Sequence, residues 1–297
     1  MSKLGSAARI LVTGATGQVG RATIEFLRED PTIQVIAGAR SPERAQLLLG
    51  HGIEFVHCDL DRPDSIAVAL RGVDRALLVT GYTVDMLRQS KAFIDGAKAA
   101  GVKHIVHLGA CGLDDTTVGH WAWHQFVERY IQWAGFTFTH LRPEWFMQNL
   151  VGYSGSRPVQ NGVLRQYVQD AVVCWVDCND VAAVAAEALR RPDDHHGQVY
   201  RLGYDAKSFE QIAQLLTNEL GQAFRYDPRS PEEFLTQMKA SGAEMAYMSC
   251  VYEHYKAYAA RTIPGVEDVF DNFDKIVGRQ PVRWPEFIRR NQDSFRY

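Results

Sequence analysis

The chain lacks an excess of either charge, a long apolar run and any long basic tract. Its 32 Lys and Arg stand against 35 Asp and Glu, so the formal charge is only -3, and nothing marks a surface for nucleic acid or anionic membrane. No window approaches the roughly 18 uninterrupted apolar residues of a membrane-spanning helix, and the first residues do not form a secretory signal. We therefore expect a soluble, cytoplasmic protein with no nucleic-acid or membrane partner.

Cysteine is scarce, and its spacing indicates no disulfide framework. There are five cysteines, an odd number, and none of them forms a Cys-x-x-Cys pair. We expect reduced thiols packed as small apolar groups. The cysteines are Cys58, Cys111, Cys174, Cys178 and Cys250.

Short β-branched runs alternate with helix-period segments over the first 141 residues. Strands that are apolar throughout are typical of a parallel sheet covered on both faces. The pattern therefore predicts an α/β fold, a Rossmann-type doubly wound parallel sheet. The expected strands are RILVT, IQVIAGA, IEFVHC, RALLVT, HIVHL and FTFTHL. The expected helices are Gln18–Glu29, Pro42–Leu49, Pro63–Leu70, Val84–Ala100 and Gly119–Ala134.

Beyond Leu141 the alternation loosens into short strands, such as AVVCWV and QVYRL, and helices, such as FEQIAQLLTNEL. We expect residues 1–150 to form the domain that contains the doubly wound sheet and residues 151–297 a smaller α+β lobe, interleaved and with an approximate boundary. No stretch near 142–155 resembles a flexible linker, so the two parts are expected to share a cleft.

Three glycines at three-residue intervals separate the first strand from the first helix, in GATGQVG. Gly14 is expected to take a positive φ, Gly17 to let the backbone approach a pyrophosphate, and Gly20 to allow close packing of helix on strand. The helix N-terminus offers free N–H groups and a partial positive charge. A dinucleotide site is predicted, and a tight turn without ligand is the alternative. The expected contacts are Gly14, Thr16, Gly17, Gln18 and Val19.

Arg40 ends the second strand, where an Asp or Glu would bond the ribose 2′-hydroxyl and repel a 2′-phosphate. A guanidinium makes planar, charge-assisted contacts with phosphate. NADP(H) is therefore favoured over NAD(H), with Arg44 one helical turn later as a second contact. A solvated arginine at a helix start is the alternative.

Two more strand ends are candidate cofactor contacts by position. Asp59 and Leu60 follow the third strand, near the expected adenine, and Thr80 and Gly81 follow the fourth, beneath the expected ribose path. Asp59 or Asp61 has a second interpretation, as a cap of the following helix.

Four parts of the chain carry a likeness to a known family: GATGQVG, Arg40, CDLDRPDSIAVALRGVDRALLVT and LRPEWFMQNL. They resemble the NmrA-like family of atypical short-chain dehydrogenases/reductases, and DCNDVAAVAAEAL and PEEF continue the likeness. The resemblance implies a Rossmann domain that binds NADP(H) and a smaller substrate lobe. Similar proteins include reductases of quinones, triphenylmethane dyes and isoflavonoid-type compounds, and also NADP-sensing regulators. The resemblance therefore indicates the cofactor better than the reaction.

The proton relay of ordinary short-chain dehydrogenases is missing from its expected place. Those enzymes use a Ser after the fifth strand and a Tyr-x-x-x-Lys on the next helix, whereas this chain has Cys111 and then HWAWHQFVE. His124 and Glu128 share one helix face and resemble a His-x-x-x-Glu of several family reductases. We expect His124 to hold the ribose or nicotinamide, or to donate a proton. A surface or core histidine is the alternative.

No metal site is predicted. His120 and His124 lack the intervening glutamate of metallohydrolase helices, and no third ligand cluster accompanies them. A Tyr-x-x-x-Lys does occur at Tyr252–Lys256, but it lies far beyond the sheet and is interpreted as coincidence.

Aromatic side chains are plentiful near the expected cleft, and a flat substrate would stack on them. Tryptophans that fill a core or an interface are the alternative, and Trp121 and Trp123 cannot both face one side of their helix. The resemblance places Pro143 and its loop over the nicotinamide, where Glu144 replaces a small residue of many relatives. This acid would narrow the site or bond the substrate. The expected substrate contacts are Tyr82, Cys111, Trp121, Trp145 and Phe146.

The function that we expect is an NADPH-dependent reductase of a flat, conjugated small molecule such as a quinone or dye. Nicotinamide supplies the chemistry, and the protein must hold the acceptor against it. A non-catalytic NADP(H)-sensing regulator is the alternative from another class. An epimerase would need the missing Tyr/Lys pair, and a homodimer is left open.

Overall fold

The computed structural model describes residues 7–152 and 159–296. Residue contacts divide the chain into two units that alternate along the sequence. Residues 181–200 belong to unit 1 although they lie beyond position 150. Unit 1 comprises Met1–Gly109, Trp123–Arg142 and Val181–Tyr200, and unit 2 comprises Ala110–Ala122, Pro143–Asp180 and Arg201–Tyr297.

Unit 1 is built on a seven-stranded sheet with the order β11-β6-β5-β4-β1-β2-β3. The pairings from β6 across to β3 are parallel. The chain order reverses at β1, which lies between β2 and β4, and such a switch point is where parallel sheets bind ligands. The predicted doubly wound sheet is confirmed. Its strands are β1 (Ala8–Val12), β2 (Ile33–Ala39), β3 (Glu54–His57), β4 (Arg75–Leu78), β5 (His104–Leu108), β6 (Thr137–Pro143) and β11 (Gln198–Leu202).

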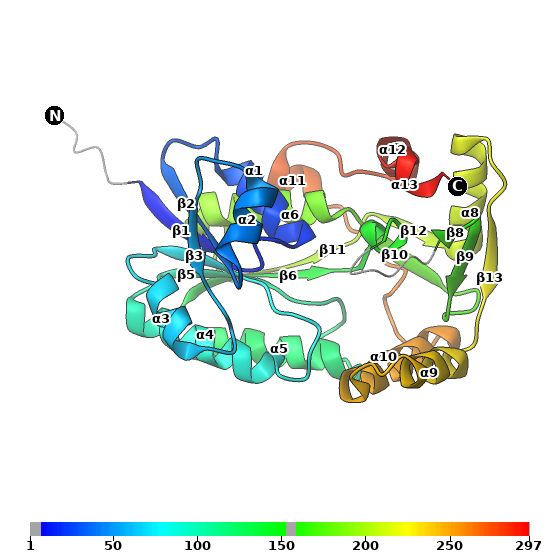
Figure 1. Cartoon of the computed structure of the whole chain (residues 1–297), viewed down its shortest axis with the longest axis horizontal. Helices are drawn as coiled ribbons and strands as arrows, with labels where there is room; N and C mark the ends of the chain where they lie inside the picture. Colours follow the sequence, from blue (N-terminus) through cyan, green and yellow to red (C-terminus); the bar gives the residue numbers. More distant parts are fainter. Residues whose placement is uncertain (1–6, 153–158, 297) are drawn as a thin grey trace. The chain divides into compact units, whose positions relative to one another are not determined.

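Helices cover both faces of this sheet. Figure 1 shows α3, α4 and α5 on one side and α1 and α6 on the other. One buried cluster joins Phe93 and Ile94 of α4 and Ile131 of α5 to strand residues Leu11 and Ile105, which explains why these strands are apolar throughout. The helices are α1 (Gln18–Leu27), α2 (Pro42–Leu49), α3 (Pro63–Ala69), α4 (Met86–Ala100), α5 (Gly119–Trp133), α6 (Cys178–Arg190) and α7 (Pro192–His195).

The expected strand QVYRL forms β11, but it is an edge strand of the main sheet, beside β6. The expected place of this strand, in the later lobe, is therefore wrong. Alternation of apolar and polar residues predicts a strand without saying which sheet it joins.

Unit 2 contains two small sheets, ordered β12-β10-β7 and β13-β9-β8. Its core gathers buried side chains that include Trp175, Phe209 and Trp284. The strands are β7 (Trp145–Phe146), β8 (Val159–Gln160), β9 (Val163–Gln166), β10 (Val172–Val176), β12 (Asp205–Ser208) and β13 (Arg225–Pro228). The helices are η1 (Met147–Leu150), α8 (Phe209–Leu220), α9 (Pro231–Ala240), α10 (Met245–Ala259), α11 (Phe273–Val277), α12 (Trp284–Arg290) and α13 (Gln292–Phe295). Within the residues described, no helix is long and apolar enough to cross a membrane.

Candidate functional site

The glycine loop between β1 and α1 has no room for side chains. Gly14 has φ +62°, and a Cβ added there would lie 3.0 Å from two carbons of Val79. A Cβ added at Gly17 would lie 3.2 Å from the carbonyl oxygen of Gly14, and a Cβ added at Gly20 would lie only 2.3 Å from the same oxygen. Gly17 is also the N-cap of α1 and makes no side-chain capping bond. The helix therefore presents uncapped N–H groups, as an anion site requires.

The neighbours of this loop differ in exposure. Gly14 and Thr16 are exposed, Gln18 is half-buried, and Val19 is buried. The hydroxyl of Thr13 donates to the carbonyl of Leu77 (3.0 Å) and accepts from the N–H of Val79 (2.8 Å). This bridge fixes the end of β1 against β4, so the loop starts from a rigid strand end.

Arg40 directly follows β2 and is exposed, as is Arg44. The charge of Arg40 helps to lower the pKa of Asp61, although the hydrogen bond from Gln89 is the largest cause. Asp61 accepts from the side chains of Arg88 (2.6 Å) and Gln89 (2.9 Å). The end of β2 thus carries a solvent-accessible guanidinium, the group that a 2′-phosphate needs.

The two other strand ends lie at the same edge of the sheet. Asp59 and Leu60 are half-buried, and the Asp59 carboxylate accepts from the N–H of Asp61 (3.1 Å). The N-cap residue of α3, Arg62, makes no side-chain capping bond, so the structure shows a local turn rather than a helix cap. Thr80 is half-buried and Gly81 is exposed, two and three residues after β4 ends.

His124 lies on α5 and faces the histidine at the end of β5. Its Nδ1 lies 3.2 Å from Nε2 of His107, and the two rings are 5.3 Å apart. His107 is fully buried, and burial is the main cause that holds its pKa well below the usual value. A neutral His107 can share one proton with His124 and fix its tautomer.

Glu128, one turn after His124, is committed to an ion pair. Its two oxygens accept from Nε (2.9 Å) and Nη2 (2.6 Å) of Arg142, and its side chain is 1% exposed. His107, Glu128 and His140 together offer ligand atoms within 4.8 Å of one another, a possible metal geometry. A guanidinium already neutralises the carboxylate, so a divalent cation would add uncompensated positive charge to a buried place.

The predicted substrate residues are divided between the units. Tyr82, in unit 1, is 64% exposed. Cys111, Trp121, Trp145 and Phe146 all belong to unit 2. Cys111 and Trp121 are buried, whereas Trp145 and Phe146 are half-buried. Trp121 is therefore a core residue in this structure, the alternative that its sequence left open.

Trp145 is the centre of an aromatic cluster in unit 2. Its indole Nε1 donates to the hydroxyl of Tyr258 (2.9 Å), and its ring lies 6.0 Å from that of His254. His254 in turn lies 5.0 Å from His120 and 4.9 Å from Trp121. Burial lowers the pKa of His120 to about 4 and that of His254 well below its usual value. Both rings are therefore neutral at pH 7 and act as flat polar surfaces.

Glu144 follows Pro143, the last residue of β6, and both are buried. Its Oε1 accepts from Nη2 of Arg201 (3.0 Å), while Oε2 has no hydrogen-bond partner among the described residues. Burial raises the pKa of Glu144 to about 7, and Arg201 partly offsets this effect. A carboxyl group that is half protonated near neutrality is a candidate acid.

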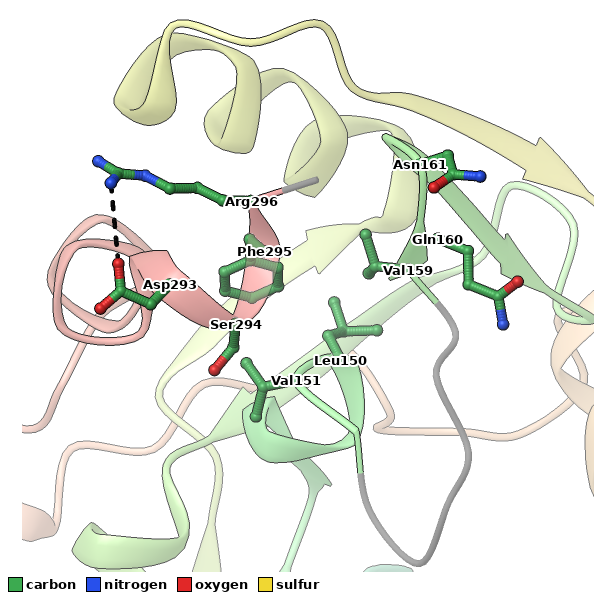
Figure 2. Close-up of a pocket in the computed structure, with 9 residues that line it drawn as sticks. All are labelled: Leu150, Val151, Val159, Gln160, Asn161, Asp293, Ser294, Phe295 and Arg296. Atoms are coloured by element: carbon green, nitrogen blue, oxygen red, sulfur yellow. Dashed lines mark ion pairs between the residues drawn. The ribbon is translucent and has the colours of Figure 1, made fainter.

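Two other features lie outside the predicted site. A hollow of about 620 Å³ lies in unit 2 and is lined by residues that include Leu150 and Phe295. Figure 2 shows these side chains and the ion pair between Asp293 and Arg296 beside them. None of the expected substrate contacts lines this hollow. On α10, Tyr252 donates to Glu232, which raises the pKa of the phenol, as burial does. This shift is opposite to the one that a Tyr/Lys relay requires.

Several residues of these sites were not identified from sequence. Arg142 directly precedes Pro143, and a charged residue inside an apolar strand indicates a buried ion pair. His107 and His140 stood in strands that were read only as apolar runs. Arg201 is 57 residues from Glu144, and no local pattern connects the two.

Residues 6–287 match the NmrA-like family. The chain is 30% identical over 290 residues to an NAD(P)H azoreductase of Xenophilus azovorans, with 96% of this chain and 99% of the relative covered. It is 32% identical over 236 residues to quinone oxidoreductase 2 of Escherichia coli, with 78% and 82% covered.

The fold is also similar to that of triphenylmethane reductase from Citrobacter sp. solved in complex with NADP(H). The TM-score is 0.81 at 27% identity, and 95% of this chain and 99% of the other are covered. The family match over residues 6–287 includes the glycine loop, residues of both units and Glu144.

Proposed function

Because the chain belongs to the NmrA-like family, we propose that it is an NADPH-dependent reductase that transfers hydride to a flat, conjugated small molecule. The observation that carries this proposal is the full-length similarity to an NAD(P)H azoreductase, together with a loop built for a dinucleotide. A quinone oxidoreductase and a dye reductase among its relatives support the coarser class, an NAD(P)H-dependent oxidoreductase.

The cofactor is held by unit 1 in this proposal. At Gly14, Gly17 and Gly20 an added Cβ would meet the protein's own atoms, so the loop keeps its tight turn, and the N-terminus of α1 has no side-chain cap and offers its N–H groups to a phosphate. Arg40 pairs with the 2′-phosphate, while Asp59, Leu60, Thr80 and Gly81 line the adenosine side. NADPH supplies the hydride when it is bound, and the protein orients it and excludes water.

His124 holds the ribose or nicotinamide end of the cofactor. Its bond with the buried His107 fixes the ring, so one nitrogen is committed and the other is oriented. Glu128 does not assist directly, because both its oxygens bond to Arg142. The role of Glu128 is to anchor α5 to β6 and thereby to set the position of His124.

The acceptor stacks on the half-buried aromatic residues of unit 2 in this proposal. Trp145 is held in place by Tyr258, and Phe146 is adjacent to it in β7. Rigid rings bind flat conjugated molecules by stacking at little entropic cost. Trp145 packs against the buried cluster that contains Trp121 and Cys111.

An NADPH-oxidation assay tests the proposal. The purified protein is given NADPH with a quinone, an azo dye or a triphenylmethane dye, and loss of NADPH is followed together with loss of the acceptor. We expect turnover of at least one acceptor, and a Gly17→Val variant should lose it because the side chain blocks the loop. Absence of turnover, with tight binding that distinguishes NADP+ from NADPH, would favour the sensing regulator.

A further inference from the structure

Glu144 is a buried carboxyl group, and only one of its two oxygens has a hydrogen-bond partner among the described residues. Its side chain is 1% exposed. A Cβ added at Gly203 would lie 2.6 Å from the Glu144 Cγ and 2.8 Å from the Cys174 Sγ. A glycine is therefore required at position 203 to accommodate this acid.

In the described part of the chain, one guanidinium is bonded to Glu144, and it is shared with other groups. Arg201 donates through Nη2 to Glu144 (3.0 Å) and to the carbonyl of Gly265 (2.9 Å), and its Nη1 lies 3.4 Å from Asp268. The guanidinium also lies over the ring of Phe270, 4.5 Å from its centroid. Its positive charge is divided, so it compensates the Glu144 carboxylate only in part.

Glu128 provides a comparison within the same chain. That carboxylate is equally buried, but a two-pronged bond with Arg142 occupies both oxygens. Glu144 has one oxygen bonded and the other without a partner among the described residues. A carboxylic acid keeps its proton on the oxygen that no cation holds, and that oxygen is then the one that can donate.

Apart from Arg201, the titratable groups around Glu144 are neutral or negatively charged. The thiols of Cys111 and Cys174 and the phenol of Tyr258 have their pKa values raised, chiefly by burial. Asp268 adds a negative charge that raises the pKa of Glu144, which burial sets at about 7. Arg201 opposes this effect, as does a hydrogen bond with the Cys111 thiol, and Arg201 stabilises the carboxylate once the proton has left.

We propose that Glu144 donates the proton that completes reduction of acceptors that cannot be reduced by hydride alone, with an azo bond as the acceptor class. The inference rests on the proposed function. Glu144 directly follows β6, at the carboxyl edge of the sheet where such folds bind their ligands. Under this proposal Glu144 donates the proton and His124 positions the cofactor.

The chemistry balances without a further reactant. Hydride from the reduced nicotinamide adds to one azo nitrogen, and the π electrons of the N=N bond move to the other nitrogen, which takes the proton from the Glu144 carboxyl group. The products are a hydrazine, NADP+ and a carboxylate paired with Arg201, which regains a proton from water. A triphenylmethane dye is a carbon cation, so hydride alone converts it to a neutral product.

The cationic dye, which needs no proton, is the control for the azo dye, which needs one. Turnover of an azo dye and of a cationic triphenylmethane dye is measured for the native protein and for Glu144→Gln, across a range of pH. The amide keeps the size of the side chain but carries no acid proton. We expect the variant to lose about 10²-fold or more in kcat on the azo dye and to keep its rate on the cationic dye.

The pH profile supplies a second measurement. Since burial raises the pKa of Glu144 to about 7, kcat of the native protein on the azo dye should fall as the pH rises through this value. The same limb should be absent with the cationic dye. Asp180→Asn is the matched control, because Asp180 is also a buried carboxyl group of unit 2, bonded to the N–H of Val282. It should change both dye rates by the same factor.

If Glu144→Gln loses the same factor in turnover rate on both dyes, Glu144 has a structural role, and the inference is overturned. If the variant keeps both rates, Glu144 has no role in the reaction, and the inference is overturned as well. Native protein that reduces only the cationic dye would also contradict it. Native protein that reduces neither dye would instead remove the proposed function, on which this inference rests. A loss of azo-dye turnover alone, with the cationic-dye rate kept, in His124→Gln but not in Glu144→Gln would transfer the acid role to His124.

Discussion

At the scale of single residues, the proposed function makes cofactor preference depend on one exposed guanidinium, that of Arg40 at the end of β2. Replacing Arg40 by Asp should repel the 2′-phosphate and offer the 2′-hydroxyl a partner, so the ratio of NADP+ to NAD+ affinity should fall by about 10-fold or more. Titration of both dinucleotides into the purified variant measures this ratio. Arg71→Asp, an exposed arginine of the same unit, should leave the ratio as it is, and an unchanged ratio in Arg40→Asp would contradict the assignment.

Gly20 is the glycine of the loop with the least space. Alanine is intrinsically better than glycine within a helix by about 1 kcal/mol, but its Cβ would lie 2.3 Å from the Gly14 carbonyl oxygen. The clash should dominate, so Gly20→Ala should destabilise the fold by about 1–3 kcal/mol and weaken NADPH binding. Urea unfolding and a binding titration measure both effects. Gly119→Ala, where the Cβ would be 3.7 Å from the nearest atom, should be close to neutral.

The residues predicted from sequence were those whose role depends on the backbone nearby. Gly14 and Gly20 follow from strand–turn–helix geometry, and the structure gives them the expected φ and the expected close packing. Glu144 was noticed as an unusual acid, but its partner Arg201 comes from β11. Sequence spacing contains no information on such a contact until the sheet order is known.

At the scale of elements, one buried ion pair joins α5 to β6. Glu128→Gln would leave the Arg142 charge buried without a carboxylate, which should cost about 3–5 kcal/mol in the free energy of unfolding. Because α5 also carries His124, the affinity for NADPH should fall as well. A double variant, Glu128→Gln with Arg142→Met, should recover part of the stability. A small effect of the single variant on urea unfolding would show that the pair does not anchor the helix.

The elements of the first 141 residues could be predicted because each has its own period. IQVIAGA and HIVHL coincide with β2 and β5, and the helix expected at Pro42–Leu49 coincides with α2. The later elements were less predictable in their arrangement. β11 is five residues long and joins the main sheet, a pairing that depends on tertiary contacts rather than on its own pattern.

At the scale of the whole molecule, buried histidines should control stability in acid. Burial lowers the pKa of His104 and His120 to about 4 and that of His140 to about 3, and lowers the pKa of His107 and His254 well below 6.5. The unfolded chain then binds more protons than the folded one below pH 6.5, so stability should fall as the pH drops from 6.5 towards 4. Two buried carboxyl groups act in the opposite sense, Glu144 between 4.5 and about 7 and Asp180 between 3.8 and about 6, but they stand against five histidines.

Urea unfolding at several pH values measures this dependence. His140→Gln should reduce the slope between pH 6.5 and 4, since one buried imidazole is removed, whereas the exposed His51→Gln should not. A stability that is flat over this range would mean that the histidines are hydrated in solution.

The account as a whole requires that a nicotinamide dinucleotide occupies the glycine loop of unit 1. Calorimetric titration of NADPH and NADP+ into the purified native protein tests this requirement most directly. We expect saturable binding of one dinucleotide per chain, tighter than that of NADH or NAD+ and abolished in Gly17→Val. No heat with either NADPH or NADP+, or binding that Gly17→Val leaves intact, would contradict the account.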